Sequence, residues 1–254
     1  MSSQQRARLK TPAEIEKMAA SAVVLAEVFR ELGRIVGPGV TTAEIDALAE
    51  RLIAEAGCLP SFKGYNGFPA TCCISVNEEV VHGIPGPRAL REGDIVGVDC
   101  GLIREGWHSD SAETFAVGRV SEEAERLLRT TRECLELAIA QSRPGKRISD
   151  LGVAVETHAR AAGFSVVETL VGHGIGRRLH EEPQVPNFRS RVLPDPVLAA
   201  GLVLAIEPMI NAGAKQVVTA ADGWTIATAD RRLSAHFEHT VAVTADGPRV
   251  LTLR

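Results

Sequence analysis

Apolar residues recur at steps of three and four between 15 and 36, a spacing that places them on one face of a helix. Thr11 and Glu14 form a capping box at its start, Pro12 suits the first helical position, and Pro38–Gly39 ends the pattern. A helix over about 12–36 is therefore predicted. Residues 1–10 lack this pattern, and we expect them to form a flexible N-terminal tail before a single catalytic domain over 11–254.

A second helix starts at another capping box, Thr41 with Glu44, and stops at Gly57. From about 69 to 118, short β-branched runs separated by Gly and Pro predict strands. The same order then restarts with a helix whose apolar stripe covers 124–138. Another helix and further strand-like runs follow it.

Two turn signals repeat at one fixed offset. Pro38–Gly39 recurs as Pro144–Gly145, and Ala56–Gly57 recurs as Ala162–Gly163, each displaced by 106 residues. Such dipeptides are common, so two of them are a weak indication, but a duplicated unit of this length favours a pseudo-symmetric fold. We predict an α+β domain in which two related halves face each other across a shared, mainly antiparallel sheet, with helices outside.

Acidic residues and histidines follow the same repeat. Asp99 ends an apolar run six residues after Gly93, and Glu207 ends another six residues after Gly201. Each half offers a histidine and two acids in the same order: His82, Asp99 and Asp110, then His173, Glu207 and Glu238.

A carboxylate at the end of an apolar strand is costly unless its charge is compensated. A hairpin turn centred on Arg104–Glu105 would set Asp99 directly opposite Asp110, with Cβ atoms about 4.5–5.5 Å apart. Like charges at that separation favour a cation between them. The alternative is that these acids lie at the surface or pair with Arg and Lys, which their repetition in both halves disfavours.

Four carboxylates and one imidazole form a mainly oxygen-donor set, which suits Mn, Fe(II), Co or Zn. The set comprises Asp99, Asp110, His173, Glu207 and Glu238. Its negative charge fits two divalent ions better than one. Two ions about 3.5–4 Å apart can hold a bridging water, lower its pKa towards about 7 and stabilise the oxyanion formed on a carbonyl.

Other residues carry weaker signals. The segment GHGIGRRLHEEP (172–183) lacks the spacing G-x-G-x-x-G, so nucleotide binding is disfavoured. Its glycines instead let the backbone turn His173 and His180 inward. His82 is a candidate for proton transfer or substrate binding, although a lone histidine is more often structural. Cys72–Cys73 is better interpreted as packing than as a nucleophile, because no matched general base is evident.

Composition narrows the class of protein further. A net charge of −4 and a pI near 6.0 argue against a general nucleic-acid binder. No apolar run approaches the ~20 residues that span a bilayer, and the first ten residues lack a signal-peptide core. Five cysteines without a C-x-x-C pair fit a reducing compartment. We therefore expect a cytoplasmic protein.

Several motifs together resemble those of the type I methionine aminopeptidases. They are CISVNEEVVHGIPG (73–86), the spacing from VDCG to HSDSAETF, GHGIGRRLHEEP, AIEPMI (205–210) and AHFEHT (235–240). The resemblance covers nearly the whole chain after residue 10. It implies the pita-bread fold of two pseudo-symmetric halves, and an enzyme that removes the initiator methionine when the next residue is small.

The resemblance also implies residue roles. Asp99, Asp110, His173, Glu207 and Glu238 would bind two divalent metal ions, with Asp110 and Glu238 bridging them and Glu207 helping to activate the water. His82 would contact the substrate near the scissile nitrogen, and His180 would hydrogen-bond the scissile carbonyl.

A pocket built by Tyr65, Phe68, Cys73 and Trp224 would hold the methionine side chain, as the resemblance implies. The position before His180 is commonly aromatic in that family and is Leu179 here. We expect this smaller wall to loosen methionine selectivity by about 1–3 kcal/mol.

The expected substrates are N-terminal methionyl peptides and nascent chains, with the ribosome as a candidate place of action. We expect a monomer that binds neither nucleic acid nor membrane directly. Two rivals stay open. A prolidase or proline-specific aminopeptidase would share the ligands but usually carries an additional N-terminal domain, and a catalytically silent relative would bind peptides without needing all five ligand positions.

Overall fold

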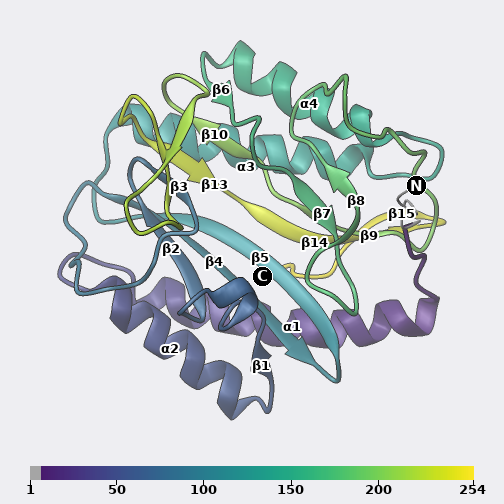
Figure 1. Cartoon of the computed structure of the whole chain (residues 1–254), viewed down its shortest axis with the longest axis horizontal. Helices are drawn as coiled ribbons and strands as arrows, with labels where there is room; N and C mark the ends of the chain where they lie inside the picture. Colours follow the sequence, from purple (N-terminus) through teal and green to yellow (C-terminus); the bar gives the residue numbers. More distant parts are fainter. Residues whose placement is uncertain (1–6) are drawn as a thin grey trace.

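The computed structural model describes residues 7–254, in which two pairs of helices flank a curved sheet (Figure 1). The helices are α1 (Pro12–Ile35), α2 (Thr42–Glu55), α3 (Glu122–Gln141) and α4 (Ile148–Ala161), with a short 3-10 turn η1 at Tyr65–Gly67. In the view of Figure 1, α1 and α2 lie on one side of the strands, and α3 and α4 lie on the other.

The first two helices begin where the sequence predicts. The Thr11 hydroxyl accepts a hydrogen bond from the Glu14 amide, and the Glu14 carboxylate accepts one from the Thr11 amide at 2.9 Å. Thr41 and Glu44 repeat this arrangement at the start of α2. Both predicted capping boxes are confirmed, because they depend only on residues three apart.

The predicted duplication is visible in the helices. α4 lies 106 residues after α2 at both its first and its last residue. The turns before these helices also match, because Gly39 and Gly145 both adopt the left-handed region at φ +92° and +87°. A side chain there would be strained, which explains why the same dipeptide recurs.

Nine strands form the main sheet. Its order is β1 (Leu59–Pro60), β4 (Ile95–Arg104), β5 (Trp107–Ala116), β14 (Glu238–Thr244), β9 (Val203–Ile206), β7 (Gly172–Gly174) and β8 (Glu181–Val185), with β2 (Cys72–Val76) on β4 and β15 (Gly247–Val250) on β14. Two three-stranded sheets complete the domain: β13 (Ser234–His236), β10 (Met209–Asn211) and β6 (Ser165–Val166), and β11 (Val217–Thr219), β12 (Ile226–Thr228) and β3 (Glu79–Val81). The pairings between these strands are antiparallel.

Each helix pair packs its apolar stripe against strands of its own half. Leu25, Phe29 and Leu32 of α1 join Ile45 of α2 and Val98 of β4 in one buried cluster. A second cluster joins α3 and α4 to the strands of the other half. Both clusters pack on the same face of the main sheet, the face opposite to that of Asp99 and Glu238, and they fix the positions of its strands.

The β4–β5 hairpin differs from its predicted register. Asp99 pairs with Ala112, and Asp110 pairs with Gly101, so the two acids are diagonal rather than direct neighbours. The turn is centred on Glu105 and Gly106, which both have positive φ, and not on Arg104–Glu105. A two-residue turn of this kind matches the twist of its strands. Because the register changes by two positions, both acids still project from the same face of the sheet.

The predicted tail over 1–10 falls mostly outside the described residues. Lys10, however, is described, and it is buried with its ammonium 2.8 Å from the Glu181 carboxylate. This residue therefore packs into the domain instead of belonging to a tail. Within residues 7–254, no helix combines the length and apolar character required to cross a bilayer.

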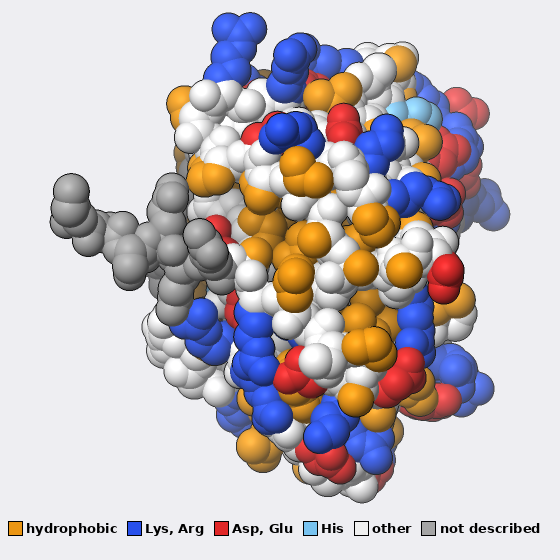
Figure 2. Space-filling view, turned by 90° about the vertical axis from the view of Figure 1, so that its right-hand side faces the viewer, with side chains coloured by type: hydrophobic (Ala, Val, Ile, Leu, Met, Phe, Trp, Pro, Cys, Tyr) orange, Lys and Arg blue, Asp and Glu red, His pale blue; other side chains and the backbone are white. Residues whose placement is uncertain are grey.

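The face seen in Figure 2 shows basic and acidic side chains interspersed with apolar ones. Such a mixture is typical of a folded protein surface. It agrees with the small net charge of −4.

Candidate metal centre

Five adjacent strands of the main sheet deliver the five predicted metal ligands. Asp99 lies in β4, Asp110 in β5, Glu238 at the start of β14, Glu207 directly after β9, and His173 in β7. These strands follow one another in the sheet order β4-β5-β14-β9-β7. Side chains far apart in the sequence therefore meet at the sheet centre.

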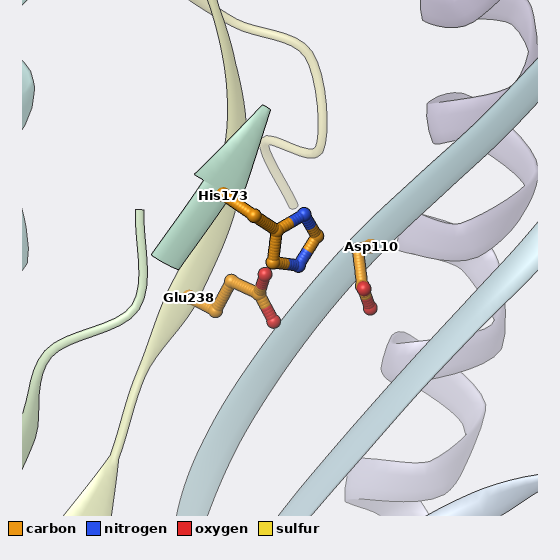
Figure 3. A group of neighbouring side chains, drawn as sticks. All are labelled: Asp110, His173 and Glu238. Carbon is orange, nitrogen blue, oxygen red and sulfur yellow. The ribbon is translucent and has the colours of Figure 1, made fainter. Parts of the chain in front are cut away.

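Three of these side chains form a compact group. Asp110, His173 and Glu238 each offer one ligand atom, and these atoms lie within 4.8 Å of one another. Figure 3 shows the three side chains converging from separate strands. Glu207 joins them, because its Oε1 atom lies 3.6 Å from Nε2 of His173.

Burial dominates the electrostatics of this group. Burial raises the pKa of Asp110 to about 7, and it also raises the pKa values of Asp99, Glu207 and Glu238, with the neighbouring carboxylates adding to each of these three shifts. Burial lowers the pKa of His173 to about 3, which keeps that imidazole neutral. A neutral imidazole and several carboxylates are the forms that bind a divalent cation.

Two buried oxygen atoms in the group lack a hydrogen-bond partner: Oδ1 of Asp99 and Oε1 of Glu238. An unpaired buried carboxylate oxygen is costly. The donors at ion-pair distance from Glu207 are His173 and His236, and burial lowers the pKa of both to about 3. The uncompensated charge and the unpaired oxygens fit a site for cations, and they argue against surface acids paired with Arg or Lys.

The ligand group forms one wall of a cavity of about 190 Å³. All twelve residues predicted for catalysis, metal binding or substrate binding line it: Tyr65, Phe68, Cys73, His82, Asp99, Asp110, His173, Leu179, His180, Glu207, Trp224 and Glu238. The structure thus brings the whole predicted set to one place.

Apolar side chains from one packed cluster form another part of the cavity lining. Phe68 meets Trp224 edge to face with ring centroids 5.2 Å apart, and Phe68, Leu179 and Cys73 are buried. Edge-to-face packing fixes both rings and leaves an apolar recess. An unbranched apolar side chain suits such a recess better than a charged one.

Two further histidines, His82 and His180, line the cavity. Nδ1 of His180 is 2.7 Å from the Tyr65 hydroxyl, and its ring centroid is 4.2 Å from that of His173. His82 adopts φ +61°, an unusual conformation for a residue with a side chain. The next residue, Gly83, packs closely on β2, because a Cβ there would lie 2.2 Å from the Ile74 carbonyl oxygen.

The thiol of Cys73 belongs to the cavity wall. Its residue pairs with Asp99 across β2 and β4. Burial, with Asp99 and Asp110 nearby, raises the pKa of this thiol well above its usual value. A protonated thiol is a poor nucleophile, which supports packing as its role.

Three residues near the cavity were not predicted for the site. Phe62 and Asn66 line the cavity, and Asn66 lies in the turn η1 with φ +49° between two glycines. His236 places its Nε2 atom 3.6 Å from Oε2 of Glu207. The sequence held a signal for His236, which stands two residues before Glu238, but none separated Phe62 from ordinary core residues.

The fold and this site define the class of protein. The profile of metallopeptidase family M24 matches residues 16–245, so the chain belongs to this family of hydrolases. Similar proteins include "Methionine aminopeptidase" of Clostridium perfringens, 50% identical over 96% of this chain and 98% of the relative, and "Methionine aminopeptidase 1" of Bacillus subtilis, 46% identical with the same coverage. The predicted resemblance is confirmed.

Solved structures agree with this assignment. The crystal structure of methionine aminopeptidase from Thermotoga maritima is similar with a TM-score of 0.95 and 42% identity, covering 98% of this chain and 100% of that one. The α+β pita-bread fold is therefore confirmed. A prolidase from Pyrococcus horikoshii has a TM-score of 0.79 at 21% identity, covering 96% of this chain but 63% of that one, and it shares the fold alone.

The buried charge of Asp110 should be measurable in metal-free protein. Its folded pKa of about 7 exceeds its usual value of 3.8, so the native state binds more protons and loses stability as pH rises between these values. Asp110→Asn removes this contribution. The variant's free energy of unfolding relative to wild type should therefore increase from pH 4 to 7 and then level off.

Urea unfolding in chelator at several pH values measures this difference, with the exposed residue Asp246 providing the control variant Asp246→Asn. A difference between Asp110→Asn and wild type that stays constant with pH would contradict the assignment of a strained buried carboxylate.

Proposed function

We propose that this metallopeptidase removes the N-terminal initiator methionine from nascent proteins, with a preference for a small second residue. The observation that carries the proposal is one cavity lined by two kinds of side chain. The five predicted metal ligands line it together with Phe68, Leu179 and Trp224, which pack in one apolar cluster. The names of its similar relatives support the same activity.

The five donors Asp99, Asp110, His173, Glu207 and Glu238 would hold two divalent ions, with Asp110 and Glu238 shared between them. Their oxygen-rich composition suits Co, Mn, Fe(II) or Zn. Bound ions would supply an activated water and polarise the substrate carbonyl. The summed negative charge, which raises the pKa values of the carboxylates, supports two ions better than one.

The other residues act directly on the peptide. Glu207 accepts the proton of the attacking water, because its carboxylate faces the cavity and has a neutral histidine on either side. His180 hydrogen-bonds the scissile carbonyl, and His82 contacts the substrate near the scissile nitrogen. The methionine side chain fills the recess of Tyr65, Phe68, Cys73, Leu179 and Trp224.

The proposed setting follows from the substrate. Methionyl peptides and nascent chains are the proposed partners. The enzyme acts on them in the cytoplasm, at the ribosome, and it does so as a monomer. Neither nucleic acid nor membrane is a direct partner. The small net charge of −4 supports this view.

A proline-specific peptidase is the closest rival, since the prolidase shares the fold. Substrate preference separates the two activities. The metal-loaded protein should cleave Met-Ala-Ser much faster than any Xaa-Pro dipeptide, because the recess binds an unbranched apolar first residue. A panel that varies the first two residues, assayed with Mn, Fe(II), Co and Zn, makes the measurement.

Preference for Xaa-Pro in that panel would overturn the proposal in favour of a prolidase. A complete lack of hydrolysis with every metal would favour a peptide-binding protein instead. The chelated protein serves as the control for activity that does not depend on metal.

Asp110→Asn should lower turnover by several orders of magnitude while the fold persists, because it removes a shared negative charge from the two-metal site. Turnover on Met-Ala-Ser and circular dichroism measure the two effects, with Asp246→Asn as the matched surface variant. Near-normal turnover in Asp110→Asn would refute the two-metal mechanism.

His180→Ala should lower turnover by about 10²–10³-fold, the scale of losing one donor to a reacting carbonyl. The metal content should stay unchanged, because His180 is not among the five ligands. Elemental analysis and steady-state kinetics test both statements. His158→Ala is a suitable control, since His158 pairs with Glu133 on the helices at 2.7 Å, away from the cavity. Loss of metal in His180→Ala would show that the role is misassigned.

A further inference from the structure

The segment Gly176–Glu181 presents two side chains to the cavity, Leu179 and His180. It connects the short strands β7 and β8. On the outer side, the guanidinium of Arg177 stacks over the Trp107 ring at 4.1 Å and donates a hydrogen bond to the Glu105 carbonyl at 3.3 Å. The Trp107 ring is buried, so these contacts hold Arg177 against the domain.

The Glu181 carboxylate makes two further contacts that hold this segment. Its Oε1 atom accepts a hydrogen bond from the Arg178 amide at 3.2 Å, which closes the segment on itself. Its Oε2 atom accepts one from the Lys10 ammonium at 2.8 Å. The side chains of Lys10 and Glu181 are 1% and 6% exposed, so this pair is screened from water.

The glycine at position 176 leaves room for the Lys10 side chain. A Cβ on Gly176 would lie 2.6 Å from Cε of Lys10 and 2.7 Å from Oε1 of Glu181. The Lys10 amide donates to the Gly201 carbonyl at 2.7 Å, and Gly201 adopts φ +97°. The lysine is thus inserted between two glycines, directly before the residue that caps α1.

We propose that Lys10 is a positioning residue for the reaction: through Glu181 it holds the segment 176–181 in the conformation that directs His180 and Leu179 into the cavity. This inference rests on the proposed function of those two residues. The ion pair joins a residue before α1 in the first half to the substrate wall of the second half. Glu181 directly follows His180 in the chain. A misplacement of about 1 Å at a reacting group can lower the rate about 10²-fold.

The neutral variants Lys10→Met and Glu181→Gln test the proposal in the metal-loaded full chain. Each should lower kcat/KM for Met-Ala-Ser by about 10- to 100-fold with unchanged metal content. The preference for methionine over leucine in the first position should also fall, because Leu179 moves. This ratio does not depend on the fraction of active enzyme, so a loss of folded protein alone leaves it unchanged. The exposed lysine in Lys17→Met is the matched control.

A double variant separates positioning from general stability. If Lys10 acts through His180, the loss in Lys10→Met/His180→Ala should be close to that of His180→Ala alone. Independent, multiplicative losses would overturn the proposal. Should Lys10→Met fold poorly because it leaves Glu181 charged and unpaired, Lys10→Met/Glu181→Gln removes both charges and gives the same test.

Amide hydrogen exchange gives a readout without turnover. In Lys10→Met, the Arg178 amide should exchange at least about tenfold faster than in wild type, while amides of β4 stay unchanged. Equal exchange at Arg178 would overturn the positioning role. If wild type fails to cleave methionyl peptides, the proposed function fails, and this exchange measurement still decides whether Lys10 orders the segment.

Discussion

The burial of several neighbouring carboxylates is the constraint on which the site depends. Asp99, Asp110, Glu207 and Glu238 share one cavity, and burial disfavours the charged form of each. A protein tolerates this arrangement only when a cation offsets the charge or protons neutralise it. The apolar helix layers, which pack on the sheet face away from these acids, therefore stabilise an arrangement of ligands that, without a cation, destabilises the protein.

The order of the strands brings these buried carboxylates together in one site. Because β4, β5, β14, β9 and β7 are neighbours, each ligand needs only its own strand to be in register. His82, His180 and Leu179 do not lie on these strands. His180 and Leu179 come from a connecting segment, whose conformation depends on contacts such as that between Lys10 and Glu181. Strands thus position the predicted metal ligands, whereas the contacts of a connecting segment position His180 and Leu179.

The parts predictable from sequence were those encoded locally or by repetition. The capping boxes, the 106-residue repeat and the five side chains that line one cavity were all predicted, because each depends on spacing along the chain. The predicted strand partner of Asp99 was wrong by two residues, Asp110 instead of Ala112. The sequence does not determine which two residues form the turn. The contacts of His236 and Lys10 were not predictable, because their partners lie far along the chain and meet only after the sheet forms.

The pairing of β14 with β5 has a consequence for the order of events during folding. His239 pairs with Ser111, more than a hundred residues earlier in the chain, and pairings this distant form slowly. The proposed metal site would therefore form late, when strands from both halves have joined. A chain still emerging from its ribosome would present isolated carboxylates to water, and it would acquire its inorganic component only at the final stage of its own maturation.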